Sequence, residues 1–106
     1  MMGSFQAMLL LAIQLLGDDA CAQEIVRVLS KYTTEPSVQQ VCAALKRLRE
    51  NGLVQADSFV KKRTRVRASA IYVCTKEGRK TLVNHLTVLD SLREACSTKG
   101  VNLNLE

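Results

Sequence analysis

Residues 37–82 read SVQQVCAALKRLRENGLVQADSFVKKRTRVRASAIYVCTKEGRKTL, and the order of patterns in this stretch decides the fold. An amphipathic helix comes first and is stopped by Gly52. Two segments, 53–59 and 68–74, are rich in Val, Ile, Tyr and Phe, as strands are. A basic hairpin lies between them, and another helix begins after them. This succession predicts a mainly α-helical domain with a two-stranded β-wing.

The positive charge of the chain is concentrated in the same stretch. Residues 37–67 contain eight Lys or Arg and two acids, which gives a net charge of +6. The rest of the chain contains seven Lys or Arg and eight acids, which gives a net charge of −1. Five of these cations form the segment that we call the wing: Lys61, Lys62, Arg63, Arg65 and Arg67. Cations so close together repel one another unless a polyanion neutralises them. The order of elements and the basic wing together predict a winged helix-turn-helix that lies on a DNA duplex.

Two further helices are expected before this stretch. The first spans 4–16, with Ser4 as its cap and a glycine at its end. Its apolar face is so wide that one side can meet the core and the other a second subunit. The second helix is expected to be capped by Asp18 or Asp19 and to end near Lys31.

A long C-terminal helix is expected at 76–96, capped by Thr75. Four leucines follow one face of it at helical spacing: Leu82, Leu86, Leu89 and Leu92. Because a complete winged domain leaves little local core for this stripe, we expect it to form a seam between two subunits. The predicted organisation is a DNA-binding domain at 1–75, a dimerisation helix at 76–96 and a loosely held tail at 97–106.

The helix at 38–50 has the two faces that a recognition helix needs. Its core face is apolar: Val38, Val41, Leu45 and Leu48. The opposite face offers candidates for reading base edges in the major groove: Gln39, Gln40, Ala43 and Arg47. Ser37, Lys46 and the wing cations are the candidates for contacts to phosphates or the minor groove, with Ser37 and Gln40 forming a capping box. For this helix alone a solvated surface is an equal alternative, and the wing favours DNA.

Catalysis and metal binding are poorly supported by the residues present. The four cysteines contain no CxxC pair and match no zinc spacing: Cys21, Cys42, Cys74 and Cys96. Each has apolar neighbours, so buried free thiols in a reducing cytoplasm are expected. The only histidine, His85, lies on the last helix, and the chain has no Gly-rich phosphate loop or paired carboxylates. We therefore expect no enzyme activity, no metal and no cofactor.

A membrane segment is not expected either. The apolar run at 7–16 is shorter than the roughly 20 residues that span a bilayer. Residues 1–6 carry no Lys or Arg, which argues against a signal peptide. The chain is expected in the cytoplasm.

These residues resemble the PadR-like transcriptional regulators of the winged-helix superfamily. Three segments carry the resemblance: AQEI at 22–25, SVQQVCAALKRLRENGLV at 37–54 and AIYVCTKEGRKTL at 70–82. Parts of the last two segments also resemble MarR-like relatives. The resemblance implies a homodimeric repressor whose last helix, often with the first, forms the dimer interface. Some relatives bind aromatic effectors through Trp between subunits, and this chain contains no Trp.

The sequence thus predicts a cytoplasmic, homodimeric regulator that binds double-stranded DNA in a sequence-specific way and represses by occluding a promoter. It defines no effector. Two alternatives remain open: a winged-helix adaptor whose basic wing meets an acidic protein, and a DNA-organising protein without sequence preference. Salt-dependent binding to a duplex would distinguish the regulator from the adaptor. Sequence-dependent binding would distinguish the regulator from the DNA-organising protein.

Overall fold

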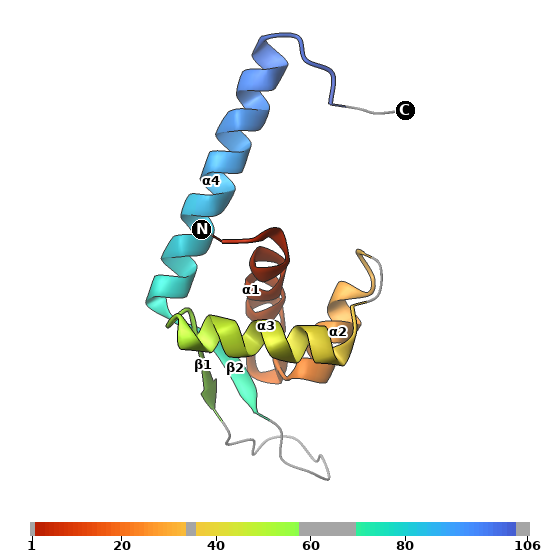
Figure 1. Cartoon of the computed structure of the whole chain (residues 1–106), viewed down its shortest axis with the longest axis vertical. Helices are drawn as coiled ribbons and strands as arrows, with labels where there is room; N and C mark the ends of the chain where they lie inside the picture. Colours follow the sequence, from red (N-terminus) through yellow and green to blue (C-terminus); the bar gives the residue numbers. More distant parts are fainter. Residues whose placement is uncertain (1, 34–35, 58–69, 104–106) are drawn as a thin grey trace.

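The computed structural model describes residues 2–33, 36–57 and 70–103. The elements follow in this order: α1 (Ser4–Leu16), a 3₁₀ turn η1 (Gly17–Asp19), α2 (Ala22–Leu29), α3 (Val38–Glu50), β1 (Val54–Asp57), β2 (Ile71–Cys74) and α4 (Lys76–Thr98). Helices α1 to α3 and the hairpin form one body, from which α4 projects (Figure 1), giving a longest dimension of 54 Å. Four helices and a two-stranded antiparallel sheet confirm the predicted fold class.

The core of the body lies around α1, which contacts α2, α3, α4 and β2. The largest side chains with almost no exposed surface come from α1, α2 and α3: Leu9, Leu10, Ile25, Val41, Leu45 and Leu48. No polar or charged residue in the described part of the chain is buried. Burial of apolar area from three helices therefore holds α3 at a fixed angle on the body.

The hairpin is attached to this core at one end. Val54 lies opposite Cys74, and Asp57 lies opposite Ile71 in the antiparallel register. The backbone N–H of Tyr72 also donates to the carbonyl of Ala20 (2.9 Å), which ties β2 to the segment before α2. The thiol of Cys74 donates to the Leu10 carbonyl (3.7 Å), and burial raises the pKa of this thiol.

The end of α3 is fixed to the start of α4. Gly52 has a φ of +76°, and the N–H of Leu53 returns to the Leu48 carbonyl (2.9 Å), as in a Schellman cap. The Leu53 carbonyl then accepts from the N–H of Thr75 (3.0 Å). Thr75 caps α4, as expected, by accepting from the N–H of Gly78 (2.9 Å).

Two expected helix caps are wrong. Gly3 is the N-cap of α1, and Ser4 is its first helical residue. After Gly17 the chain makes a 3₁₀ turn that contains Asp18 and Asp19, so α2 begins later, with Cys21 in the N-cap position. Both acids therefore lie before α2, in the turn that joins it to α1.

The other element boundaries differ by a few residues. Helix α2 ends at Leu29 rather than near Lys31, and α4 continues two residues further than expected, to Thr98. The described strands, β1 and β2, are shorter than the segments 53–59 and 68–74 that the composition favoured. Leu53 and Ala70 are described but lie outside the strands, and positions 58–59 and 68–69 lie outside the described residues.

Candidate nucleic-acid interface

The start of α3 is held by a reciprocal pair of hydrogen bonds. The Ser37 hydroxyl accepts from the N–H of Gln40 (3.0 Å), and the Gln40 side-chain oxygen accepts from the N–H of Ser37 (3.0 Å). This is the capping box that the sequence predicted. It uses one acceptor site of the Gln40 side-chain oxygen, so the second acceptor site and the amide NH₂ of Gln40 remain for contacts to a base.

The outer face of α3 lies opposite its buried residues. Four of the predicted contact residues are exposed there: Gln39, Ala43, Lys46 and Arg47. Neither Lys46 nor Arg47 has an ion pair or a side-chain hydrogen bond to another residue in the described part of the chain. Two cations, an amide and a small alanine thus share one accessible helix face with the acid Glu50, and the cations and the amide suit entry into a major groove.

Two residues on the sides of α3 depart from the prediction. Val38 was expected in the core and is 45% exposed, because it lies in the first turn, beyond the reach of α1 and α2. Cys42 was expected to be buried and is exposed. Burial is the main reason that the pKa of the Tyr72 hydroxyl is raised. Cys42 raises this pKa further, and the positive charge of Arg49 lowers it. This side of α3 therefore faces the hairpin.

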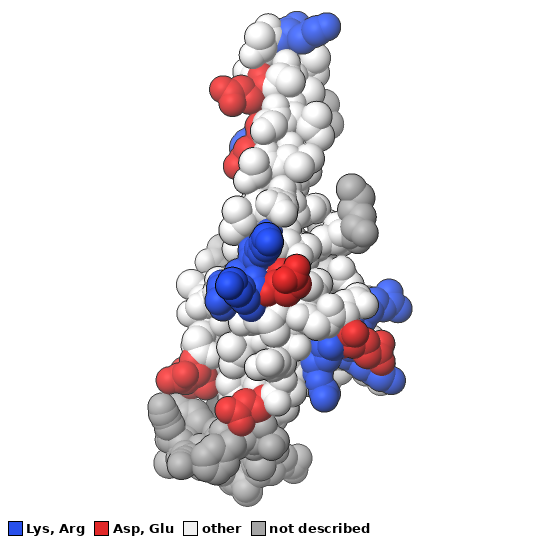
Figure 2. Space-filling view, turned by 90° about the vertical axis from the view of Figure 1, so that its left-hand side faces the viewer, with Lys and Arg blue, Asp and Glu red and all other residues white. Residues whose placement is uncertain are grey.

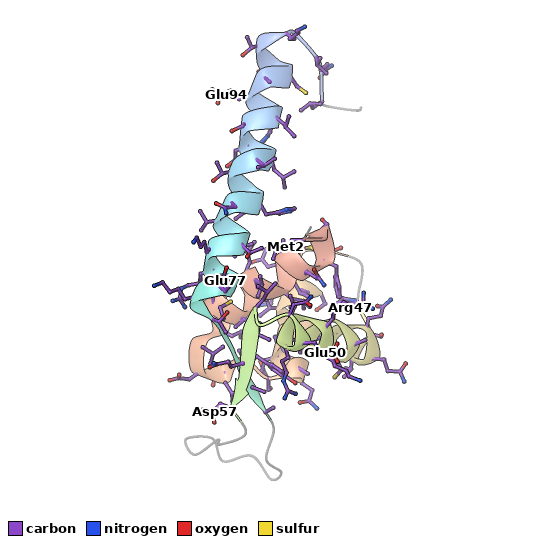
Figure 3. All side chains as sticks on the ribbon, turned by 60° about the vertical axis from the view of Figure 1, so that its left-hand side comes forward. Met2, Arg47, Glu50, Asp57, Glu77 and Glu94 are labelled. Atoms are coloured by element: carbon purple, nitrogen blue, oxygen red, sulfur yellow. The ribbon has the colours of Figure 1, made fainter. Side chains whose placement is uncertain are left out.

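The hairpin leads away from the end of α3. Arg47 and Glu50 come from α3, and Asp57 comes from the far end of β1 (Figure 3). The wing cations follow β1 in sequence but lie outside the described residues: Lys61, Lys62, Arg63, Arg65 and Arg67. Their contact with DNA remains a prediction.

The leucine stripe of α4 divides into two parts with different surroundings. Leu82 is 2% exposed and belongs to the core of its own chain, and Leu86 packs against that core. Leu89 and Leu92 are 50% and 60% exposed. They lie on the segment 87–98, which we call the arm. Leu82 is therefore not available to the predicted seam between subunits, because the first turns of α4 pack against the core of their own chain.

The arm presents an extended apolar surface. All side chains from 87 to 95 are exposed, including Val88 as well as the two leucines. Figure 2 shows charged side chains along one edge of the arm and at its tip, with an uncharged surface between them. Exposed apolar surfaces of this kind are typical of contacts between proteins.

Two hollows in the body were not predicted. The larger, which we call the α1–α3 groove, has a volume of about 640 Å³ and is lined by Phe5, Gln6, Met8, Thr33, Pro36, Gln40, Ala43, Ala44 and Arg47. The smaller, about 240 Å³, lies between α1 and α2 and is lined by Met8, Leu11, Ala12, Leu15, Val28, Leu29 and Tyr32. Both join residues far apart in the chain, so no local sequence signal marks them.

Comparison with known proteins identifies this arrangement. A PadR family transcription regulator from hypervirulent Clostridium difficile R20291 superposes with a TM-score of 0.71 at 14% identity, covering 90% of this chain and 97% of that one. The chain has the fold of that PadR family regulator. A proposed transcriptional regulator from Thermoplasma acidophilum superposes with a TM-score of 0.64 at 19% identity, covering 92% and 93%. No protein-family model and no curated protein matches the sequence.

The PadR fold agrees with the resemblance that the sequence suggested, and at these identities the likeness establishes the fold alone. Within the described ranges no helix is long and apolar enough to cross a membrane. Within the same ranges no three side chains of His, Cys, Asp or Glu are grouped so that they could hold a metal ion.

Proposed function

We propose that this protein is a transcriptional regulator that binds double-stranded DNA with sequence preference, and that it is not an enzyme. The outer face of α3 is the observation that carries the proposal. Gln39, Ala43 and Arg47 are exposed together on a helix whose opposite face is fixed in the core. Arg and Gln recognise guanine and adenine edges in the major groove, and Lys46 and the helix N-terminus suit phosphates.

We further propose that the protein acts as a homodimer. Leu89 and Leu92 on the arm and Leu11 and Leu15 on α1 are apolar and exposed in the single chain. A two-fold dimer that buries these residues would present two copies of α3 to one duplex, with the recognition helices about 34 Å apart. A dimer held across a promoter would exclude polymerase, so we infer repression by occlusion.

The proposal is tested by selecting bound sites from a random duplex pool and then comparing two variants on the selected site. Arg47→Ala removes a cation from the outer face of α3, and Arg49→Ala removes one from the side that faces the hairpin. Arg47→Ala should cost about 1–3 kcal/mol on the selected site and relax its preferred sequence. Arg49→Ala should preserve the preferred sequence. If Arg47→Ala keeps full affinity and the same preference, α3 is not the reader.

The wing is tested by salt titration. Replacing Arg63 and Arg65 with Ala should weaken binding to selected and random duplexes alike, because phosphate contacts carry no sequence information. The slope of log affinity against log salt should become shallower by about 0.9 per lost contact. An unchanged slope on both duplexes would refute a phosphate-binding wing. Weak duplex binding with little salt dependence would instead favour the protein adaptor, and salt-sensitive binding without sequence preference would favour a DNA-organising protein.

A further inference from the structure

One side of α4, next to the leucine stripe, has its charges sorted by sign. Seven residues share this side at helical spacing and are exposed, and we call them the charged face of α4: Lys76, Arg79, Lys80, Val83, Thr87, Asp90 and Glu94. The cations lie in the first turns of the helix, and the two acids lie in the arm. Figure 2 shows this order, with blue side chains gathered at the base of α4 and red ones further along the arm. Glu77 lies beside the cations and Arg93 beside the acids, each on a flank of the charged face.

The charges on this face do not stabilise α4 itself. None of the five has an ion pair with a residue that the structure describes, and Arg79 only donates to the Cys74 carbonyl (3.1 Å). Like charges recur four positions apart along the face, a spacing at which they repel one another. Cations at the start of a helix also interact unfavourably with its dipole. The order of charges is therefore better suited to a partner than to the helix alone.

The charged face is complementary to itself when it is reversed. Lys76 and Glu94 lie nine positions to either side of position 85, and Lys80 and Asp90 lie five positions to either side of it. Two copies of α4 that meet antiparallel at this position therefore place each lysine opposite an acid, and two-fold symmetry repeats every pair. The side chain of Val83, which is 59% exposed, lies near the middle of this contact.

We propose that the charged face of α4 binds the same face of a second copy in antiparallel orientation. This contact is separate from the apolar seam, because Leu89 and Leu92 point to a different side of the helix. It pairs single chains, and where the proposed apolar seam also forms it joins dimers into larger assemblies. Exposed ion pairs are individually weak, so the contact grows with protein concentration and weakens with salt.

The contact is tested by cross-linking of the full chain without DNA. A carbodiimide joins a lysine amine directly to a carboxylate, so it links only groups that touch. Mass spectrometry of the digested product should identify amides from Lys76 to Glu94 and from Lys80 to Asp90. Along one helix these pairs are about 27 Å and about 15 Å apart, at roughly 1.5 Å per residue, so each link must join two copies. The links should form at about 10 mM salt and fall at least tenfold at about 1 M, where charges are screened beyond about 3 Å.

Charge reversal separates complementarity from general effects of substitution. Lys76→Glu with Lys80→Glu should lose the links, because like charges then meet. Asp90→Lys with Glu94→Lys should lose them for the same reason. An equimolar mixture of the two variants should restore links between positions 76 and 94 and between 80 and 90, since every pair again has opposite signs. All four positions are exposed, so both variants should fold. Glu77→Gln, which removes a carboxylate outside the charged face, is the matched control and should keep the links.

The apolar seam is tested separately with Leu89→Ser and Leu92→Ser, which remove apolar area without adding charge. This variant should keep the salt-sensitive links, and their loss would assign them to the apolar seam and overturn the second contact. No link in the wild type at low salt, or no link in the mixture of the two reversed variants, would also overturn it. Reduced duplex affinity of Lys76→Glu with Lys80→Glu, in a protein that forms no links, would assign the cations to DNA instead. The cross-linking contains no DNA, so its failure leaves the proposed function untouched.

Discussion

Gly78, in the first turn of α4, packs against the backbone of Leu53, the residue that follows the cap of α3. Tight packing against this backbone decides how replacement of Gly78 by alanine changes the stability of the protein. A Cβ at position 78 would collide with the carbonyl oxygen of Leu53 and approach its carbonyl carbon to 3.0 Å. These are backbone atoms, so they cannot rotate aside as a flexible side chain can. The Leu53 carbonyl is also held by the N–H of Thr75 (3.0 Å).

Two effects of Gly78→Ala oppose each other. Alanine is a better helix former than glycine by at most about 1 kcal/mol, which would stabilise α4. Overpacking against fixed atoms costs about 1–3 kcal/mol, and displacing the Leu53 carbonyl weakens a hydrogen bond worth about 1 kcal/mol. We expect the contact to prevail and the free energy of unfolding to fall by about 1–3 kcal/mol. For a domain of this size the midpoint of thermal unfolding falls by about 4–8 °C for each kcal/mol.

The assay is thermal unfolding followed by far-UV circular dichroism at one protein concentration, since a dimer makes the midpoint concentration-dependent. Asn84→Ala, on an exposed position of the same helix, is the control for substitution in α4 and should change stability by less than about 0.5 kcal/mol. Because Leu53 directly follows the cap of α3, Gly78→Ala should also reduce duplex affinity while the helix content is retained. A variant as stable as the wild type, or more stable, would refute the close contact between Leu53 and α4.

Four further predictions concern the dimer, the core, the α3 cap and the buried thiol. Leu89→Asp with Leu92→Asp should give a folded monomer in sedimentation, since both side chains are exposed in the single chain, and a persisting dimer would contradict the proposed seam. Leu82→Ala should instead cost about 2–5 kcal/mol of stability because it opens a cavity in the core, and a neutral result would contradict its burial. Ser37→Ala should cost about 1 kcal/mol in urea unfolding, and Ser37→Asp should preserve the cap; equal loss in both would argue against a capping role. Burial raises the pKa of the Cys74 thiol, so the folded chain keeps this proton at a pH where the unfolded chain has lost it. The free energy of unfolding should therefore be unaffected below the ordinary thiol pKa of about 8.5 and should fall as the pH rises above it. The fall should be shallower in Cys74→Ala, which has no thiol at this position.

The sequence determined the features that depend on neighbouring residues. The bounds of α1, the capping box of Ser37 and Gln40, the end of α3 at Gly52 and the cap of α4 at Thr75 all follow from local patterns. Each of these signals acts within about one helical turn, where backbone groups must be paired whatever the rest of the chain does. The order of elements, read with the basic wing, was enough to predict the fold class.

Tertiary structure decided the features that depend on which surfaces meet. Helical spacing placed Leu82 and Leu89 on one stripe, and only packing against α1 shows that the first is core and the second is exposed. The same holds for Val38, which has the right spacing for the core but lies beyond the neighbouring helices. The α1–α3 groove joins Phe5 to Arg47, more than 40 positions apart in the chain. Periodicity fixes a residue's direction on its own helix, whereas burial and cavities depend on contacts between distant segments, which no local pattern contains.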